Sequence, residues 1–506
     1  MQQYIEKILT APVYDVAHET ALDAMPRLSA RLGHQILAKR EDLQPVFSFK
    51  CRGAYTRMYR LSQEERARGV ICSSAGNHAQ GVALAASRLK IRATIVMPAT
   101  APAIKVDAVR RLGGEYVDVV LYGDFYDEAS QHAKALQTER GYTYIHPFDD
   151  PDTIAGQGTV GLEILTQHPH RIDAVFVPVG GGGLLAGMAL IIKHLRPDVR
   201  IIGVEPVDAA SMTNAVQNGS RISLDHVGIF ADGVAVKEPG AHTYAIIKDL
   251  VDGFITVSTD EICAAMKDIF DDTRAIAEPS GALALAGLKK WAAQQTTENM
   301  TLISVITGAN VNFDRLRYVA ERTAIGEQRE GLIAVTIPER PGAFLAFCKS
   351  LRDSYITEFN YRYQDDRLAQ IFVGIQLDHG HAQVESIIAA LREKGYTCEN
   401  LTENELAKTH LRYMIGGAAQ GAANERLFSF GFPERPGALF HFLTTLGTNF
   451  NISLFHYRNQ GTDHGRVLCG IQSLNAHELE AHLAAIGYDY HEETANPAYH
   501  RFLKPA

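Results

Sequence analysis

The sequence predicts an α/β fold of open parallel sheets covered by helices, followed by a C-terminal pair of ferredoxin-like βαββαβ units. From about residue 15 to 320, short apolar β-branched runs alternate with Ala-rich helical stretches, which is the order that produces a parallel sheet with helices on both faces. After a polar connector at 322–330 the pattern changes, and a motif appears twice. The chain of 506 residues is also too long for a single hydrophobic core.

The expected strands of the first region are continuous apolar runs, as is typical of sheets that are buried on both faces. Examples are 93–97, 174–177, 201–204 and 302–306, and the helical stretches between such runs include 77–89, 103–112 and 184–195. In this architecture ligands bind outside the carboxyl ends of the strands, where glycine-rich turns lead into helices.

The repeat in the second region begins with Pro-Glu-Arg-Pro-Gly-Ala at 338–343 and again at 433–438. Phe-x-Tyr-Arg and Gly-Ile-Gln follow in both copies, and the spacing agrees to within one residue. Each copy is expected to run strand, helix, strand, strand, helix, strand, with Pro341 and Pro436 in a first helical turn, where a missing N–H costs nothing. Two copies indicate a paired regulatory domain, because a solenoid needs at least three.

We therefore predict three domains. Residues 1–325 form a catalytic domain of two α/β lobes, and residues 326–420 and 421–506 form the two regulatory units.

The composition argues against several classes of protein. The formal net charge of −9, with no sustained Lys/Arg block, argues against a nucleic-acid-binding protein, which needs a basic surface. The six cysteines are scattered without metal-type spacing, so we expect reduced thiols and no metal site. The first twenty residues contain charges and no long apolar core, and no apolar run is long enough to span a bilayer. We expect a cytoplasmic protein that acts away from membranes.

Lys50 is the most informative residue of the chain. It lies in Phe-Ser-Phe-Lys-Cys-Arg-Gly-Ala, ahead of a helix-forming stretch. Aromatic and small neighbours can remove solvent from its amine and so lower the pKa, and a neutral amine forms a Schiff base with an aldehyde cofactor. On its own, a lysine beside two phenylalanines is more often an ordinary amphipathic side chain.

A glycine run between an apolar strand and a helix provides the second feature. It consists of Gly180, Gly181, Gly182 and Gly183, and Leu184 follows it. The backbone of such a run, with the helix N-terminus behind it, binds a dianionic phosphate. No Gly-Lys-Ser/Thr follows, which excludes a Walker loop, and the dinucleotide fingerprint does not fit. Glu205 lies at about the distance of a ribose-binding acid, so a nucleotide site remains an alternative.

The third feature is a turn made of Ser74, Ala75, Gly76 and Asn77. It follows an apolar strand, and the N–H groups at the start of the next helix are placed to hold a substrate carboxylate. Asn77 is placed to donate to a cofactor oxygen. The structural alternative is a plain helix cap, because Ser and Asn are favoured at that position. His78 is expected to act behind the site or as a hydrogen-bonded structural group.

Thr307 opens the sequence Thr-Gly-Ala-Asn at the end of the strand 302–306. A hydroxyl at this place hydrogen-bonds a neutral pyridine nitrogen, whereas a carboxylate would keep the nitrogen protonated. The neutral ring is the weaker electron sink, which favours loss of a β-leaving group over transamination. Taken alone, Thr307 is better explained as a turn residue. Together with an imine-forming lysine, a phosphate cradle and a carboxylate cradle, it indicates a pyridoxal-phosphate enzyme.

These motifs resemble the tryptophan-synthase-β-type (fold type II) pyridoxal-phosphate enzymes and, within them, the biosynthetic threonine deaminases. The matching segments cover nearly the whole chain and include 39–42, 48–54, 74–81, 155–159, 180–184, 277–282, 307–310 and both Pro-Glu-Arg-Pro-Gly repeats. The resemblance implies that Lys50 carries pyridoxal 5'-phosphate, that Asn77 contacts its ring oxygen and that Thr307 faces its pyridine nitrogen. It also assigns the phosphate to 180–184 and the substrate carboxylate to 74–77.

Two positions separate this chain from its relatives. Many relatives have Ser at the position of Thr307, and the hydroxyl is retained here. By the same resemblance, racemizing relatives carry a Ser at the position of Ala75. There it acts as a second base on the opposite face of the cofactor. This chain has no ionisable group there, so the resemblance implies elimination and not racemization. Cys51 is expected only to pack.

The resemblance implies dehydration and deamination of L-threonine, with L-serine as a possible slower substrate, to give 2-oxobutanoate and ammonia in the first step of isoleucine biosynthesis. The C-terminal units resemble ACT-like amino-acid-sensing modules, in which isoleucine inhibits and valine counteracts it. Tyr361 and Tyr457 then line effector sites, although a half-buried strand tyrosine is the structural alternative. The family further implies a homotetramer.

Two alternatives remain open. A non-catalytic amino-acid sensor would explain the repeats, but the intact Lys50, Asn77, glycine run and Thr307 argue against it. A β-replacing lyase, such as a cysteine synthase, or a serine dehydratase would explain the lysine and the glycines, but it would not need two sensing repeats.

Overall fold

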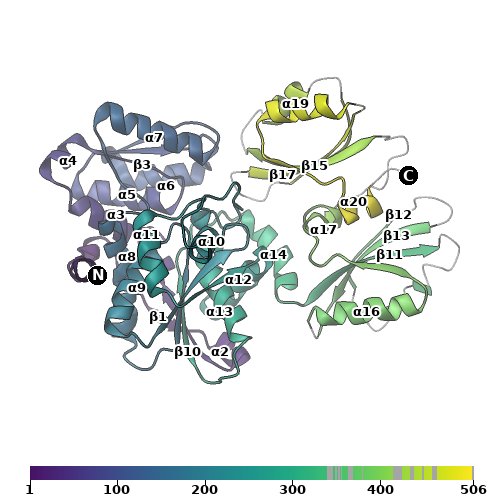
Figure 1. Cartoon of the computed structure of the whole chain (residues 1–506), viewed down its shortest axis with the longest axis horizontal. Helices are drawn as coiled ribbons and strands as arrows, with labels where there is room; N and C mark the ends of the chain where they lie inside the picture. The colour runs from purple at the N-terminus through teal and green to yellow at the C-terminus, as the bar shows by residue number, and fades with distance from the viewer. Residues whose placement is uncertain are drawn as a thin grey trace. The chain divides into compact units, whose positions relative to one another are not determined.

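The computed structural model divides the chain into two compact units, Met1–Asn312 and Phe313–Ala506 (Figure 1). The structure describes residues 1–338, 346–347, 350–351, 354, 356–362, 368–378, 380–413, 424–433, 438–446, 450–458, 464–473 and 475–503. Pro341 and Pro436, for which the sequence predicts first helical turns, lie outside these ranges. Not one helix in the described ranges has the length and apolar character needed to cross a bilayer.

The first unit contains a six-stranded sheet in the order β1-β2-β10-β7-β8-β9. All neighbours in it run parallel except β1, which pairs antiparallel with β2. Its strands are β1 (Leu22–Ala24), β2 (Gln35–Arg40), β7 (Ala174–Pro178), β8 (Arg200–Pro206), β9 (Gly253–Val257) and β10 (Thr301–Ile306). The predicted strands at 174–177, 201–204 and 302–306 all lie in it.

Helices cover both faces of this sheet. Successive side chains of a strand point to opposite faces, so each strand contributes apolar side chains to a core on either side. On β7, Val175 and Val177 join the core formed with α8 and α9, whereas Phe176 points the other way and its ring lies 5.6 Å from that of Trp291 on α13. The helices of this lobe are α1 (Gln2–Leu9), α2 (Pro26–Leu32), α8 (Pro151–Gln167), α9 (Gly183–Leu195), α10 (Ser211–Asn218), α11 (Ala241–Leu250), α12 (Thr259–Thr273) and α13 (Pro279–Ala292).

Local sequence explains where several of these helices begin. Asp150 accepts hydrogen bonds from two N–H groups of the first turn of α8, and Pro151 occupies its first position. Ser258 and Glu261 form a capping box at the start of α12.

A smaller four-stranded parallel sheet forms the second lobe of the unit, in the order β5-β4-β3-β6. Its strands are β3 (Val70–Ser73), β4 (Ala93–Met97), β5 (Val117–Leu121) and β6 (Thr143–Tyr144). In Figure 1, α7 lies on one side of this sheet and α5 and α6 on the other. The helices are α3 (Lys50–Tyr59), α4 (Gln63–Arg68), α5 (Asn77–Leu89), α6 (Ala103–Gly113) and α7 (Tyr126–Arg140). The prediction of two helix-covered parallel sheets is confirmed.

The second unit contains two four-stranded antiparallel sheets, β12-β13-β11-β14 and β16-β17-β15-β18. Each sheet has the strand order of a ferredoxin-like unit, and both carry a bulge at the same place in their second strand. The strands are β11 (Glu330–Pro338), β12 (Ile356–Arg362), β13 (Leu368–Gln376), β14 (Thr397–Asn400), β15 (Glu425–Pro433), β16 (Asn451–Arg458), β17 (His464–Gln472) and β18 (Tyr490–Glu492).

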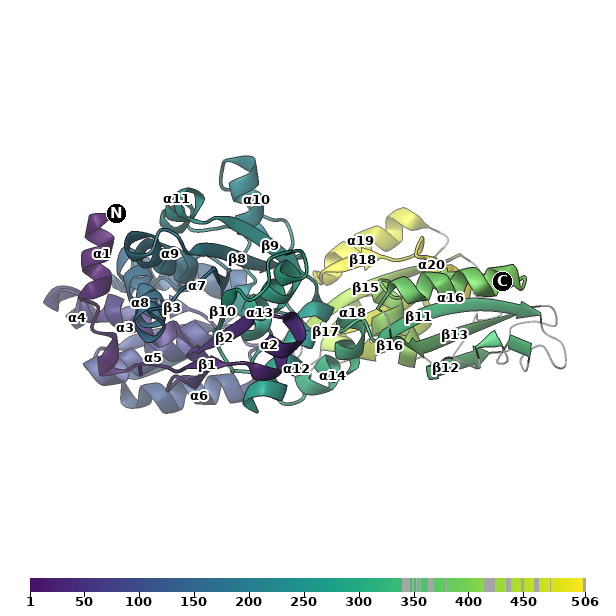
Figure 2. The same ribbon diagram turned by 90° about the horizontal axis from the view of Figure 1, so that it is seen from below.

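Helix α16 lies along one face of the first of these sheets, and α19 along one face of the second (Figure 2). Leu332 of β11 and Phe372 of β13 point to the opposite face and share a core with Leu427 of β15 and Leu468 of β17. The two repeats are therefore packed as a pair. The helices of this unit include α14 (Arg315–Gly326), α16 (Ala382–Glu393), α17 (Glu405–Thr409), α18 (Ala438–Leu446), α19 (Ala476–Ile486) and α20 (Pro497–Phe502).

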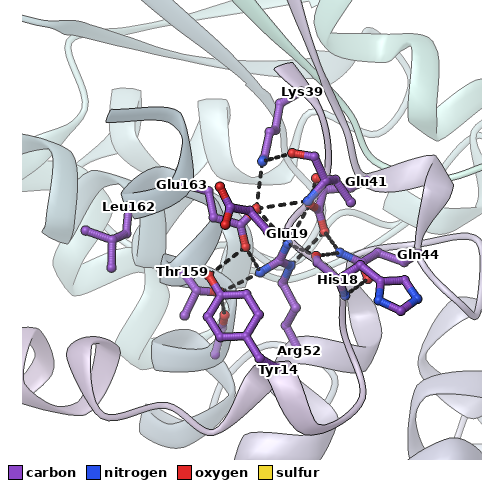
Figure 3. Close-up of polar contacts among 12 residues, drawn as sticks. Tyr14, His18, Glu19, Lys39, Glu41, Gln44, Arg52, Thr159, Leu162 and Glu163 are labelled. Carbon is purple, nitrogen blue, oxygen red and sulfur yellow. Dashed lines mark hydrogen bonds and ion pairs between the residues drawn. The ribbon is translucent and has the colours of Figure 1, made fainter. Parts of the chain in front are cut away.

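A buried cluster of charges fixes α3 to the rest of the first unit (Figure 3). Arg52, which is fully buried, donates two hydrogen bonds of 2.8 Å to the Glu41 carboxylate and bonds of 2.5 and 3.0 Å to Glu163. The Lys39 amine lies 2.6 Å from Glu163, and Tyr14 donates to the same carboxylate. Two cations face two carboxylates, so the cluster is neutral. It also holds the helix on which Lys50 is the first residue.

Removing one carboxylate from this cluster leaves two buried cations with a single counter-charge. We expect Glu163→Ala to lower the free energy of unfolding by about 3–5 kcal/mol, because an uncompensated buried charge is costly. Lys237→Ala, which breaks an exposed pair with Asp127, should cost under about 1 kcal/mol. Urea unfolding of both variants measures the difference, and equal losses would contradict this account of the cluster.

Glu205, at the end of β8, caps α10. Its buried carboxylate accepts hydrogen bonds from the N–H groups of Met212 and Thr213 and from the Thr213 hydroxyl. Burial outweighs these bonds and raises the pKa of Glu205 to about 7. Both carboxylate oxygens are engaged by the protein, which leaves the predicted nucleotide alternative without support from this residue.

The raised pKa predicts a pH-dependent stability. Between the unfolded pKa of about 4.5 and the folded value of about 7, the folded state binds more protons, so this group's stabilisation is lost as pH rises. Glu205→Gln removes that loss, so its free energy of unfolding relative to the unsubstituted protein should rise from pH 5 to pH 8, by up to about 3 kcal/mol. Thermal unfolding across this range tests the prediction, with the exposed Glu64→Gln as control. A difference that does not change with pH would contradict it.

Candidate active site

The motifs singled out in the sequence all follow the carboxyl end of a parallel strand. The run 74–77 follows β3, the glycine run follows β7, and Thr307 follows β10. The segment that leads to Lys50 follows β2 and pairs with the residue after Thr307 through a bridge between Ser48 and Gly308. The topology thus collects these motifs where α/β sheets bind ligands.

Lys50 is the first residue of α3, and its side chain is partly buried. The amine donates a hydrogen bond of 2.9 Å to the Pro147 carbonyl and lies 5.2 Å from the centre of the Phe49 ring. Loss of solvent lowers the pKa of Lys50 to about 8, and the Glu278 carboxylate opposes part of this shift. A substantial fraction of the amine is therefore neutral at mildly alkaline pH.

The glycine run forms a tight turn between β7 and α9. Gly182 has φ +95°, a conformation that side chains rarely allow. The Phe148 ring lies against Gly181 so closely that a Cβ there would be 2.3 Å from it. Leu184 is buried in the first turn of α9. The run provides backbone N–H groups without side chains at the N-terminus of α9, which is the kind of arrangement that binds a phosphate.

Asn77 begins α5, and its amide is held from two sides. Its Nδ2 donates to Glu278 Oε1 at 2.6 Å, and its Oδ1 accepts from Asn310 Nδ2 at 2.6 Å. The preceding residues, Ser74, Ala75 and Gly76, are partly exposed, and the Ser74 hydroxyl accepts from the Gly76 N–H at 3.2 Å. The turn is therefore ordered and remains accessible.

Thr307 is buried after β10, and its hydroxyl donates to the Ser280 carbonyl at 3.1 Å. The Ser280 hydroxyl is also buried and has no hydrogen-bond partner within the described residues. The N–H of Phe49, next to Lys50, donates to the Thr307 carbonyl at 3.3 Å. Thr307 thus joins the segment that carries Lys50 to the first turn of α13.

The structure adds one functional candidate that the sequence analysis did not single out. Glu278 is buried, binds Asn77 and influences Lys50 electrostatically. It lies in a segment that contributed to the resemblance, but its contact with Asn77 spans 201 residues. In the sequence, the only indication of Glu278 was a carboxylate directly before Pro279. Residues at such positions usually cap helices.

Other predicted residues have structural partners. His78 is buried beside the Ile145 carbonyl, at 2.8 Å, and burial lowers the pKa of this imidazole to about 3, which keeps the ring neutral. Cys51 is fully buried. Within the described ranges, no group of three or more His, Cys, Asp or Glu side chains is arranged to hold a metal.

The two effector candidates occupy matching places in the repeats. Tyr361 pairs with Ile371 across β12 and β13, and Tyr457 pairs with Val467 across β16 and β17. Their side chains lie outside the described part of the structure.

The residues gathered here fit pyridoxal 5'-phosphate. An amine with a lowered pKa suits its aldehyde, and the glycine turn suits its phosphate. The buried hydroxyls of Thr307 and of Ser280, whose hydroxyl is unpartnered within the described residues, suit a pyridine nitrogen. The glycine run has no Walker lysine, so it does not fit a Walker-type nucleotide site.

Comparison with known proteins agrees with this chemistry. Residues 13–308 match the family described as pyridoxal-phosphate-dependent enzyme, and residues 321–411 and 416–503 match the C-terminal regulatory domain of threonine dehydratase. The biosynthetic L-threonine dehydratase IlvA of Burkholderia multivorans is 53% identical over 502 residues, which cover 99% of both chains. The corresponding Escherichia coli protein is 52% identical over 99% of this chain and 97% of its own.

Among solved structures, the processed form of threonine deaminase isoform 2 from Solanum lycopersicum matches with a TM-score of 0.63 and 52% identity. The match covers 64% of this chain and 88% of that one. The family models, the full-length relatives and the solved structure thus indicate the same family. The chain belongs to the fold type II pyridoxal-phosphate-dependent enzymes and, within them, to the biosynthetic threonine dehydratases with a C-terminal regulatory domain.

Proposed function

We propose that this protein converts L-threonine to 2-oxobutanoate and ammonia, as the first step of isoleucine biosynthesis in the cytoplasm. The observation that carries the proposal is the partly buried Lys50 amine, whose pKa is lowered to about 8, in one site with Asn77, Thr307 and the glycine turn. L-Serine, which differs by one methyl group, is a slower substrate.

Pyridoxal phosphate, when bound, supplies an electron sink that stabilises negative charge at the substrate Cα. Lys50 is the residue that holds the cofactor aldehyde and that takes the Cα proton. A general base works best with a pKa near the operating pH, and partial burial brings the pKa of Lys50 into that range.

The N–H groups of the turn formed by Ser74, Ala75, Gly76 and Asn77 bind the substrate carboxylate. They lie at the N-terminus of α5, where backbone donors and the helix dipole favour an anion. Ala75 offers no second base, so a proton removed by Lys50 is not replaced from the other face.

Asn77 contacts the cofactor ring oxygen. Glu278 and Asn310 fix the orientation of its amide, because each binds a different atom of that group. With the cofactor bound, the Thr307 hydroxyl would turn from the Ser280 carbonyl, to which it donates here, and donate to the pyridine nitrogen. The nitrogen would then stay neutral. A neutral ring favours elimination of the β-hydroxyl.

We expect Lys50→Ala to lose the visible absorbance of the bound cofactor and to lower kcat by at least about 10³-fold, because both the covalent link and the proton acceptor are removed. Purification with pyridoxal phosphate, an absorbance spectrum and a 2-oxobutanoate assay test this. Lys248→Ala, an exposed lysine on α11, should change neither. Retention of absorbance and turnover in Lys50→Ala would overturn the assignment.

The regulatory proposal is that isoleucine inhibits the enzyme through the C-terminal repeats and that valine counteracts it. Tyr361 and Tyr457 are the proposed effector-binding residues, in domains spanning 326–420 and 421–506, with the catalytic domain at 1–325. We further propose a homotetramer. The support is the match to a regulatory domain and the packing of two equivalent repeats as a pair.

Allosteric coupling of about 1–3 kcal/mol corresponds to an affinity change of roughly 5- to 150-fold. Isoleucine should therefore raise the threonine concentration needed for half-maximal rate by that factor, and valine should reverse the change. Removal of the residues after 325 should leave an active enzyme that ignores isoleucine. A truncated enzyme that still responds to isoleucine would contradict the regulatory proposal.

A further inference from the structure

The segment 146–149, after β6, touches both halves of the proposed cofactor site. The Pro147 carbonyl accepts from the Lys50 amine, and the Phe148 ring lies on Gly181. The His146 ring fixes the turn, since its Nδ1 accepts from the N–H groups of Phe148 and Asp149 at 3.3 and 2.8 Å. Burial lowers the pKa of His146, which keeps Nδ1 available as an acceptor.

Asp149 continues this segment and caps α11. Its carboxylate accepts hydrogen bonds of 2.9, 2.8 and 3.2 Å from the N–H groups of Ala241, His242 and Thr243. These are the first three residues of α11. Asp149 comes from a segment 92 to 94 residues earlier in the chain. The cap therefore fixes the start of α11 relative to the 146–149 segment.

Thr243, in the first turn of α11, connects this helix to the glycine run. It is fully buried, and its hydroxyl donates to the Gly181 carbonyl at 2.6 Å, with the Gly240 carbonyl further away at 3.2 Å. The Gly240 N–H lies 3.4 Å from the same Gly181 carbonyl. Because Gly181 precedes Thr243 by 62 residues, the bond from the Thr243 hydroxyl to the Gly181 carbonyl joins α11 to the glycine run and is not a contact within the helix.

The consequence follows from the geometry of the peptide unit. The Gly181 carbonyl and the Gly182 N–H belong to one planar group and point in opposite directions. Gly182, at φ +95°, lies between two glycines, whose φ and ψ angles are not restricted by a side chain. A hydrogen bond to the carbonyl on one side therefore determines where the Gly182 N–H points on the other.

We infer that Thr243 is a positioning residue for the cofactor phosphate, with Asp149 holding Thr243 in place. This inference rests on the proposed function, in which the glycine run binds the phosphate. Thr243 does not touch the cofactor in this account. It acts by holding the Gly181–Gly182 peptide so that its N–H faces the anion before the anion arrives.

The test compares pyridoxal phosphate with pyridoxal, which has the aldehyde and the ring but lacks the phosphate. Apoprotein is titrated with each, and the visible absorbance of the bound form gives Kd. Thr243→Val keeps the shape and removes the hydroxyl, and it should raise the Kd for pyridoxal phosphate about 5- to 20-fold, as expected for one lost hydrogen bond to a positioned group. The Kd for pyridoxal should stay within about twofold, because no phosphate is bound. Thr243→Ser retains the hydroxyl and should restore the original affinity.

A matched pair of variants tests the supporting role of Asp149. Asp149→Ala and Asp150→Ala each remove a helix cap, from α11 and α8 respectively, so both should lower the thermal stability of the apoprotein. Of these two variants, only Asp149→Ala should raise the Kd for pyridoxal phosphate more than the Kd for pyridoxal.

The outcomes separate this inference from the proposed function. If Thr243→Val raises the Kd for both ligands equally, or for neither, the positioning role is wrong while the cofactor assignment stands. If the unsubstituted apoprotein binds no pyridoxal phosphate, the proposed function fails, and this inference fails with it. If it binds pyridoxal as tightly as pyridoxal phosphate, the phosphate role of the glycine run is wrong, and Thr243 has nothing to position.

Discussion

The candidate site depends on loops that leave the carboxyl ends of parallel strands in two different sheets. Strand β3 of the smaller sheet is followed by the turn 74–77, and β7 and β10 of the larger sheet are followed by the glycine run and Thr307. The hydrogen bond from Asn310 to Asn77 joins the loops of the two sheets. Lys50 reaches the same place through the bridge between Ser48 and Gly308. The chemistry is thus carried by loops, while the sheets hold these loops in register.

Two kinds of buried charge serve this arrangement in different ways. In the cluster of Arg52, Glu41, Glu163 and Lys39, every charge meets an opposite one, and the result is a rigid support for α3. Two residues before Arg52, Lys50 donates to the Pro147 carbonyl, and the Glu278 carboxylate offsets only part of its loss of solvent, so its pKa falls. A stable helix carrying a poorly compensated amine is what a reactive lysine needs, because rigidity and low basicity come from separate neighbours.

The sequence predicts the parts of this protein that are local. Glycine turns, apolar strands and the repeated Pro-Gly motif are each contained in a few residues, and the sheets of both units are as predicted. The contacts of Glu278, Asp149 and Thr243 could not be predicted, because each joins residues that are 62 to 201 positions apart. In the sequence Asp149 is one of two adjacent aspartates before Pro151, and nothing indicates that one caps the following helix while the other caps α11.

The core between the two repeats has a consequence for the origin of the regulatory unit. Leu332 and Leu427 occupy the same place in the two copies, as do Phe372 and Leu468, and all four meet in one core. A face that packs against its own equivalent is self-complementary, which is the property of a twofold homodimer interface. Gene duplication of a single dimerising module would produce this geometry directly, and fusion would then convert a concentration-dependent association into a permanent one.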